Sequence, residues 1–377
     1  MLLMGVATML VAVLPTYQQI GFLAPALLMV LRLVQGFAVA GEISAASSMI
    51  LEHAPFGRRG FFGSFTLQGT QFGQILAAAV FLPLAHWLSY DAFHSWGWRI
   101  PFALSAVVVL AGYIIRRRVE ETPSFKEEVE DNEIPESPII VAFRENTGTI
   151  IKVFCMALMN IVAVTTAIFG ATYATNPGYG VGFHADVYLW IPLAGNLIAV
   201  LVIPFVGNLS DKIGRRPCII VGALVSGAMS FAYLWAVSQQ NVVLAIVFSL
   251  IMWGAVYQGY NAVFPAYYPE LFPTKTRVTS MAIAQNMGTV ASSAMSIVFA
   301  AIVPPGTSHG TIILVVGGLT FLLTVISAIA AFLSPETYRM HRDDLGVPGA
   351  QQIPKDEYDR LRAESLAQAR AAKAARH

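Results

Sequence analysis

The stretch GNLSDKIGRRP, residues 207–217, is the part of the sequence that decides the fold. Apolar runs flank it on both sides, at residues 186–207 and 217–237. Each run has the roughly 20 residues that a helix needs to cross the hydrocarbon core of a bilayer. The charged residues between the runs therefore form a short connection at one membrane surface, and Gly207 and Gly214 permit a tight turn there.

The composition of the 377 residues agrees with a membrane protein. Hydrophobic residues make up 56% of the chain and charged residues 12%, whereas soluble domains are about 45–50% apolar and about 25% charged. The mean hydropathy is +0.63 and the net charge is +1. These values exclude a soluble globular protein, a nucleic-acid binder and a disordered chain. Cys155 and Cys218 form neither a disulfide framework nor a metal-binding pattern, so we expect no metal and no cofactor.

Apolar runs of spanning length recur along the whole chain. They lie at residues 23–50, 61–88, 98–115, 150–174, 186–207, 217–237, 242–265, 276–303 and 310–333. A tenth run, residues 1–14, is shorter, and it lacks the basic start and the cleavage site of a secretory signal. The sequence therefore predicts an all-α integral membrane protein with about ten transmembrane helices.

Every second connection between the runs is basic. The basic segments are residues 51–60, 116–149, 208–217, 266–277 and the tail 334–377. All 23 Lys and Arg residues lie in these segments, except Arg32, Arg99 and Lys152, and Lys152 begins the adjoining helix. Cytoplasmic loops carry such an excess of basic residues. We therefore expect a multi-pass protein of the plasma (inner) membrane with a cytoplasmic C-terminus.

An internal repeat relates the two halves of the chain. The segment EHAPFGRRGFFGSFTLQG, residues 52–69, has the same order of features as ELFPTKTRVTSMAIAQN, residues 270–286, at an offset of about 218 residues. The offset leaves the first two helices of the second half without a counterpart in the first. We interpret the chain as about ten helices of a twelve-helix fold, with two helices missing at the N-terminus. A true ten-helix protein is the alternative.

Several motifs point to one family. GNLSDKIGRRP resembles the G-x-L-x-D-x-x-G-R-R loop of the major facilitator superfamily, and RLVQGFAVAGE, residues 32–42, resembles the R-x-x-Q-G motif of its fourth helix. A narrower resemblance, to the metabolite:proton symporter branch, rests on RLVQGFAVAGE together with EHAPFGRRGFFGS, residues 52–64, EETPSF, residues 120–125, and YYPELFPTKTRVTS, residues 267–280. That branch includes shikimate, α-ketoglutarate, citrate and proline/betaine carriers. The resemblance covers residues 1–340 and implies a major facilitator fold of two helical bundles.

The resemblance also implies a role for the charged loop. In that family the loop latches the two bundles together on the cytoplasmic side while they rock. The residues expected to form this gating loop are Gly207, Asp211, Lys212, Gly214, Arg215 and Arg216. We expect Asp211 to accept hydrogen bonds near a helix terminus, and the three basic residues to stay among anionic lipid headgroups.

Arg32 and Glu42 are charged residues inside the run 23–50. A charge deep in a membrane helix costs on the order of 2.5–3.5 kcal/mol unless it faces a cavity or a partner. Ten residues separate the two, which is about 15 Å along a helix, so they are not expected to pair. Arg32 is a candidate for binding a substrate carboxylate or for coupling, and Glu42 for carrying a proton. A purely structural role is the alternative for both.

Polar residues inside the runs are the remaining candidates for a substrate cavity. The candidates are Gln35, Gln68, Gln71, Asn160, Trp253, Tyr257, Gln258, Asn261 and Gln285. Gln68 and Gln71 recur with Gln74 at helical spacing, and the aromatic and amide cluster 253–261 is the expected substrate wall. Hydrogen bonds between helices are the alternative for each residue.

We expect an incomplete N-terminal bundle of four helices at 1–118, an acidic cytoplasmic linker at 119–149, a six-helix bundle at 150–335 and a cytoplasmic tail at 336–377. The predicted function is secondary active transport of a small polar metabolite, an organic acid or a zwitterion, by alternating access with proton symport. The alternatives are a non-transporting remnant, a facilitative carrier without proton coupling, and a membrane-embedded enzyme or scaffold.

The expected partners are a small-molecule substrate, protons and the lipid bilayer, but no nucleic acid, and we expect a monomer. No catalytic constellation points to an enzyme. The tail is a solvated extension or touches anionic lipid through a group of arginines. The arginines of that group are Arg360, Arg362, Arg370 and Arg376.

Overall fold

The computed structural model describes residues 2–116 and 138–374. The helices of the first half are α1 (Leu2–Ala12), α2 (Tyr17–Ile20), α3 (Leu23–His53), α4 (Arg59–Trp87), α5 (Tyr90–Ala92), η1 (Phe93–Gly97) and α6 (Arg99–Arg116). The second half begins with α8 (Pro138–Ala157), η2 (Leu158–Asn160), α9 (Ile161–Ala163), η3 (Val164–Phe169), α10 (Gly170–Thr175), η4 (Pro177–Tyr179), α11 (Ala185–Ile213) and α12 (Arg215–Ser238). It continues with α13 (Val242–Ser249), η5 (Leu250–Tyr257), α14 (Gln258–Asn261), α15 (Phe264–Glu270), η6 (Thr274–Thr276), α16 (Arg277–Ile302), α17 (His309–Phe332) and α18 (Lys355–Ala374).

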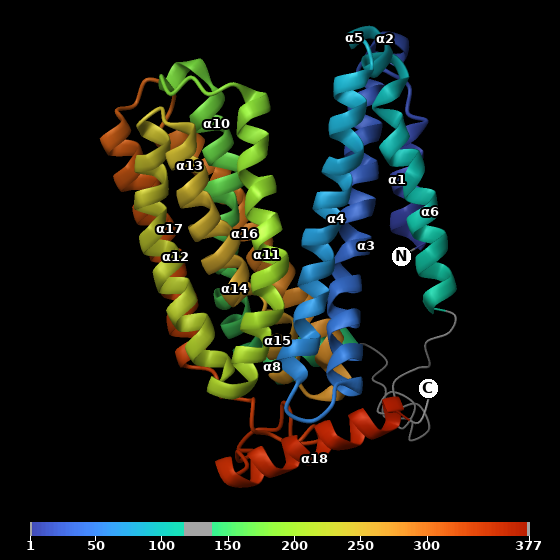
Figure 1. The fold of residues 1–377 in the computed structure, drawn as a ribbon, viewed down its shortest axis with the longest axis vertical. Helices are drawn as coiled ribbons and strands as arrows, with labels where there is room; N and C mark the ends of the chain where they lie inside the picture. Colours follow the sequence, from blue (N-terminus) through green and yellow to red (C-terminus); the bar gives the residue numbers. More distant parts are fainter. Residues whose placement is uncertain (1, 117–137, 375–377) are drawn as a thin grey trace.

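The helices form two bundles that stand side by side (Figure 1). The first bundle holds α1 to α6, and the second holds α8 to α17. The bundles meet at one end, where α18 lies across the base of the molecule, and their ribbons diverge toward the opposite end (Figure 1). We call the end covered by α18 the α18 end.

The helices confirm the prediction of an all-α membrane protein. Seven helical stretches in the described part of the chain are long and apolar enough to cross a bilayer. They are Leu23–His53, Ser95–Ile114, Ile139–Thr175, Trp190–Ile213, Arg215–Ser238, Val242–Glu270 and His309–Phe332. The helices α4 and α16 have 29 and 26 residues but are more polar, and α1 has 11. Together these helices account for the ten apolar runs of the sequence.

The helix α8 begins at Pro138, twelve residues before the apolar run predicted to start at residue 150. Its added turns carry polar residues: Glu145 forms an exposed ion pair with Lys275, and Asn146 donates to the Thr276 hydroxyl at 2.9 Å. Hydropathy marks the apolar core of a span rather than its ends, so the helix extends past the run into polar surroundings. Residues 117–137, which hold most of the acidic linker, lie outside the described residues.

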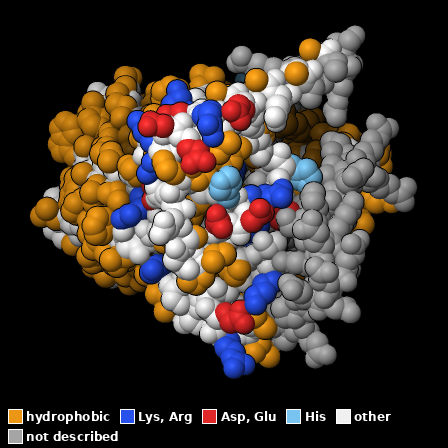
Figure 2. Space-filling model, turned by 90° about the horizontal axis from the view of Figure 1, so that it is seen from below, with side chains coloured by type: hydrophobic (Ala, Val, Ile, Leu, Met, Phe, Trp, Pro, Cys, Tyr) orange, Lys and Arg blue, Asp and Glu red, His pale blue; other side chains and the backbone are white. Residues whose placement is uncertain are grey.

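Large hydrophobic side chains cover the sides of the molecule, as expected for a surface that faces lipid. Phe37 and Trp87 are 81% exposed, and Leu201 is 74% exposed. Figure 2 shows the opposite character at the α18 end, where acidic and basic side chains gather on the face and hydrophobic ones lie along its flank. This division places the charged loops of the sequence at one end of the bundles.

Small residues bring the helices of the second bundle into close contact. A Cβ atom built on Gly227 of α12 would lie 2.0 Å from the Thr324 hydroxyl oxygen of α17, and one on Gly317 would lie 2.7 Å from the Phe231 ring. The backbones of these two helices therefore approach each other more closely than any larger residue would allow. This packing agrees with the role of small residues between membrane helices.

Replacing Gly227 with alanine should destabilise the second bundle, because the added methyl group would overlap the Thr324 hydroxyl. Overpacking of this kind costs about 1–3 kcal/mol, which outweighs the roughly 1 kcal/mol that alanine gains over glycine in a helix. The measurement is the free energy of unfolding of the purified chain in detergent. Gly318→Ala is the matched control, since nothing lies within 4 Å of its added methyl group. Equal stability of the two variants would contradict this packing.

Candidate functional site

Asp211, near the end of α11, caps a helix of the other bundle. Its carboxylate is fully buried and accepts hydrogen bonds from the backbone N–H groups of Gly60 and Phe61, each at 2.8 Å, in the first turn of α4. Such amide groups have no partner within their own helix, and they form the positive end of its dipole. The expectation that Asp211 binds near a helix terminus therefore agrees with the structure, and the terminus belongs to the first bundle.

Two glycines make this contact between the bundles possible. A Cβ atom on Gly60 would lie 2.6 Å from the Gly207 carbonyl oxygen, and a Cβ atom on Gly207 would lie 2.6 Å from the Cβ of Ser64. The start of α4 and the end of α11 therefore touch backbone to backbone. Larger residues at either position would move the Asp211 carboxylate away from the amides that it accepts.

Arg215 begins α12 and lies in the centre of a buried charge cluster. Its guanidinium donates to Asp211 Oδ1 at 2.8 Å, to Glu270 Oε1 at 3.2 Å and to Glu270 Oε2 at 3.3 Å. Only 1% of the side chain is exposed. The expectation that Arg215 stays among lipid headgroups is therefore wrong: two buried carboxylates supply the charge that lipid phosphates were expected to supply.

Two further ion pairs connect the bundles in reciprocal fashion. Arg59 of α4 lies 3.3 Å from Glu270 at the end of α15, and Arg277 of α16 lies 3.3 Å from Glu52 of α3. All four side chains are buried. Both Arg59 and Arg277, and both Glu52 and Glu270, are related by the 218-residue offset of the repeat. Each repeat thus gives its carboxylate to the arginine of the other.

The remaining basic residues of the loop have different surroundings. Lys212 is exposed, as expected for a residue near lipid headgroups. Arg216 is half-buried, and its guanidinium donates to the carbonyl oxygens of Ala331 and Phe332 at the end of α17. A cation there is favourable because the last carbonyls of a helix carry partial negative charge. Its location among lipid headgroups stays a prediction.

Glu336 is a functional residue that the sequence analysis missed. Its two carboxylate oxygens accept hydrogen bonds from the backbone N–H groups of Arg215 and Arg216, each at 2.9 Å. The carboxylate therefore caps the N-terminus of α12 and fixes the turn at Gly214, whose φ of 110° suits glycine. The only indication in the sequence was that Glu336 is an acidic residue close to the last span.

Further from the α18 end, a row of polar side chains joins α4, α11 and the π-helical segment η5. The Trp253 ring nitrogen donates to Asn196 at 3.1 Å, and the Asn196 amide donates to Gln74 at 2.7 Å. Gln68 donates to the Val200 carbonyl oxygen at 2.8 Å. The row therefore supplies hydrogen bonds between the two bundles.

Tyr257 connects Asn160 to the aromatic cluster. Its hydroxyl donates to the Asn160 side chain at 2.8 Å, and the Asn160 amide donates to Thr289 at 3.0 Å. The rings of Trp253 and Tyr257 stack at 5.1 Å, and both side chains are buried. The structure thus brings three of the predicted site residues together: Tyr257 hydrogen-bonds to Asn160 and stacks on the ring of Trp253.

Four predicted site residues keep an unused acceptor. They are Gln71, Gln258, Asn261 and Gln285. The side-chain amide oxygen of each is buried and accepts no hydrogen bond from any described residue. Buried polar atoms of native proteins nearly always have a partner, which includes bound molecules and water. These four atoms are therefore candidates for contacting a polar ligand.

Arg32 and Gln35 lie outside the aromatic cluster, on the wall of a cavity of about 580 Å³. Arg32 donates to the Gln35 side-chain oxygen at 3.2 Å, and Gln35 donates to the Thr8 hydroxyl at 2.8 Å. Asn286 of α16 lines the same cavity, so both bundles contribute to it. A guanidinium on a cavity wall is able to bind a carboxylate.

Glu42 lines a second, mostly apolar cavity of about 500 Å³ between α1, α3, α4 and α6. Thr70 and Ser105 contribute hydroxyl groups to its wall. The carboxyl group therefore lies inside the first bundle, one cavity away from Arg32. Arg32 and Glu42 line different cavities, but Met4, Thr8 and Val39 lie in the walls of both, so the two cavities adjoin.

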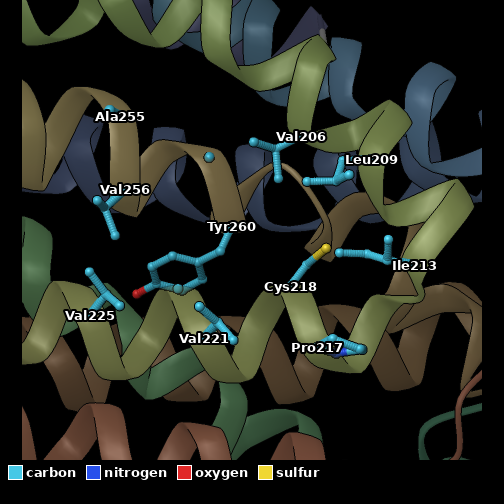
Figure 3. Close-up of a pocket in the computed structure, with 12 residues that line it drawn as sticks. Val206, Leu209, Ile213, Pro217, Cys218, Val221, Val225, Ala255, Val256 and Tyr260 are labelled. Atoms are coloured by element: carbon cyan, nitrogen blue, oxygen red, sulfur yellow. The ribbon is translucent and has the colours of Figure 1, made fainter.

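A third cavity, of about 340 Å³, lies on the second bundle between α11, α12 and the segment η5–α14 (Figure 3). Valine and leucine side chains line it, and Tyr260 and Cys218 border it (Figure 3). The Tyr260 hydroxyl accepts a hydrogen bond from Ser226 at 3.2 Å. Val221 in its wall is 61% exposed. The cavity therefore opens on the outer, apolar side of the bundle and offers no charged group to a polar ligand.

Comparisons with known proteins agree with this architecture. A sequence profile of the Major Facilitator Superfamily matches residues 1–296 and 181–352. The shikimate transporter of Escherichia coli (strain K12) is 28% identical over 344 residues, which cover 89% of this chain and 76% of that protein. The glycine betaine/proline/ectoine/pipecolic acid transporter OusA of Dickeya dadantii (strain 3937) is 29% identical over 293 residues, which cover 76% of this chain and 58% of that protein.

Solved structures share the fold. The proton:xylose symporter XylE bound to 6-bromo-6-deoxy-D-glucose superposes with a TM-score of 0.67 at 19% identity, over 89% of this chain and 79% of that one. The partially occluded, inward-open xylose transporter XylE from E. coli gives a TM-score of 0.62 at 18% identity, over 89% and 80%. The relatives named here are transporters rather than enzymes. The shikimate and glycine betaine/proline transporters match the branch predicted from the motifs.

Replacing Glu270 with glutamine should destabilise the contact between the bundles at the α18 end, because Arg215 and Arg59 would lose their shared buried counter-charge. Removing one partner of a buried ion pair costs about 3–5 kcal/mol. The measurement is the free energy of unfolding of the purified chain in detergent. Glu145→Gln is the matched control, since its ion pair with Lys275 is exposed and is worth at most about 1 kcal/mol. Similar losses in both variants would show that the cluster contributes no more than a surface pair.

Proposed function

The chain belongs to the Major Facilitator Superfamily, and we propose that it is a secondary active transporter that moves a small polar metabolite by alternating access. The observation that carries the proposal is the reciprocal pair of buried ion pairs between the bundles, Arg59 with Glu270 and Arg277 with Glu52. Such contacts hold the α18 end closed. Access alternates when the bundles rock about the site between them and these contacts break.

The basic loops support a cytoplasmic location for the α18 end. Arg59, Arg215 and Arg277 lie at this end, and the alternate connections at the other end carry no Lys or Arg apart from Arg99 beside one of them. By the positive-inside rule the α18 end faces the cytoplasm of the cell. In this orientation the structure corresponds to a carrier that is closed toward the cytoplasm, in the plasma (inner) membrane.

The proposed substrate is an organic acid or a zwitterion. Arg32 on the wall of the 580 Å³ cavity supplies a cation for a carboxylate. The unused amide oxygens of Gln71, Gln258 and Asn261 supply acceptors for hydroxyl or ammonium groups. The relatives named for shikimate and for glycine betaine and proline carry molecules of these two kinds.

Proton symport is the proposed energy source. Glu42 is the acidic residue that the sequence places well inside a span, and its cavity has mostly apolar walls. Acidic residues inside membrane spans mark the proton pathways of pumps and transporters. A solved structure with the same fold is described as a proton:xylose symporter, which supports coupling to protons.

Replacing Arg32 with alanine should strongly reduce uptake without loss of protein from the membrane, because the substrate carboxylate loses its cation. A charge-assisted hydrogen bond is worth about 1.5–3 kcal/mol, so uptake at low substrate concentration should fall about 10- to 100-fold. The measurement is uptake of labelled shikimate and labelled proline into proteoliposomes that contain the full chain. Arg32→Lys, which keeps the charge, should retain part of the activity. Uptake by Arg32→Ala at the rate of the unmodified chain would show that Arg32 does not bind the substrate.

Replacing Glu42 with glutamine should abolish uptake driven by a proton gradient, because the glutamine side chain does not ionise and cannot bind and release a proton during the transport cycle. In the unmodified chain a protonophore should collapse the same uptake. Uptake that survives the protonophore would identify a facilitative carrier, in which case Glu42→Gln should have little effect. If the unmodified chain takes up neither probe under an imposed gradient, the chain acts as a non-transporting remnant toward both.

A further inference from the structure

The segment from Glu336 to Leu366, which we call the C-terminal strap, contacts both bundles at the α18 end. It leaves the second bundle at the end of α17, and its helix α18 runs across the base of the molecule (Figure 1). The less exposed residues of α18 recur every three or four positions at Tyr358, Leu361 and Ser365. One face of the helix therefore packs against the bundles, and the other face is exposed.

The strap binds the first bundle through backbone oxygens and apolar side chains. The Arg59 guanidinium donates to the carbonyl oxygens of Met340 at 2.9 Å and Thr337 at 3.3 Å. Leu51 of α3 packs with Met340 and Leu345 in a buried apolar cluster. Arg59 therefore forms an ion pair with Glu270 and hydrogen bonds with the strap at the same time.

The loop between α3 and α4 inserts an aromatic ring into the strap. The Phe56 ring lies 5.7 Å from the His341 ring and 5.5 Å from the Tyr358 ring. Gly57 beside it has a φ of 74°, and a Cβ atom there would lie 2.6 Å from the Arg362 side chain. The fit is therefore close on both sides of the loop.

Tyr358 also binds the second bundle, at the charged loop itself. Its hydroxyl donates to the Asp211 carbonyl oxygen at 2.9 Å. Burial raises the pKa of Tyr358 to about 12, so the hydroxyl keeps its proton at neutral pH and remains a donor. The Thr337 hydroxyl donates to Glu270. A single side chain, Tyr358, thus touches Phe56 of one bundle and Asp211 of the other.

We propose that the C-terminal strap is a latch for the transport cycle, and that Tyr358 is its positioning residue. The contacts of Tyr358 with Phe56 and with Asp211 exist together only while the bundles meet at the α18 end. The strap therefore stabilises the arrangement that is closed toward the cytoplasm, and it must release Phe56 and Arg59 when that end opens. This proposal rests on the rocking motion proposed above, and it adds a control that lies outside both bundles.

The test is double electron–electron resonance on the full chain in lipid nanodiscs. Native cysteines Cys155 and Cys218 are replaced by alanine. One spin-label pair, at Ile114 and Val221, reports the width of the α18 end, and a second pair, at Trp87 and Val243, reports the opposite end. All four positions are exposed. The first pair should lengthen and the second shorten when the α18 end opens.

Tyr358→Phe, which keeps the ring and loses the hydroxyl, should raise the ratio of open to closed molecules about fivefold, the worth of one hydrogen bond. Tyr358→Ala and Phe56→Ala should raise it about tenfold or more, because they also remove the ring contact. The matched control is Asp359→Ala, on the exposed face of α18, which should leave both distances unchanged. Elution as a single species and an unaltered melting temperature verify that Tyr358→Phe is folded.

Glu270→Gln separates failure of the latch from failure of the proposed function. If Glu270→Gln opens the α18 end while Tyr358→Phe, Tyr358→Ala and Phe56→Ala leave both distances unchanged, the strap is no latch, and the rocking motion stands. If Tyr358→Ala only lowers the melting temperature, its role is structural and the latch is wrong. If no variant changes either distance, including Glu270→Gln, the rocking motion is absent and both proposals fall.

Discussion

The buried carboxylate of Glu270 is the contact on which the closed end of the molecule depends. It lies between Arg215 of its own bundle and Arg59 of the other. Removing such charges from water costs several kcal/mol for each ion, and only close pairing and added hydrogen bonds offset that cost. The cluster is therefore stable when it is complete and unstable when one member leaves. In the proposed transport cycle, an assembly of this kind favours two discrete arrangements of the bundles over a continuous range between them.

The internal repeat explains why the contacts come in pairs. Glu52 and Arg59 occupy the positions in the first half that Glu270 and Arg277 occupy in the second. Two copies of one structural unit that face each other across an approximate twofold axis present the same acid to the same base twice. The two ion pairs of 3.3 Å are the result. Asp211 has no described counterpart, and its partner is instead the first turn of α4.

Much of the fold could be predicted from the sequence, and less of the site. Long apolar runs and alternating basic loops predict spans and their order, because hydrophobic burial and loop charge are local properties. The offset of the repeat already relates Arg59 to Arg277, so the reciprocal ion pairs could have been predicted from the sequence. The burial of Arg215 was not, because the carboxylate that receives it, Glu270, lies 55 residues away. The contact of Tyr358 with the Asp211 backbone, 147 residues apart, left no signal in composition or spacing.

The way in which Asp211 binds α4 has a consequence for how the two halves of the chain can diverge. Its partners are backbone amides of residues 60 and 61, which every amino acid except proline provides. The side chain at position 61 therefore takes no part in this hydrogen bond. A substitution there requires no compensating substitution at Asp211. This contact tolerates most changes at position 61, whereas a proline at position 60 or 61, or a bulky residue in place of Gly60 or Gly207, would break it.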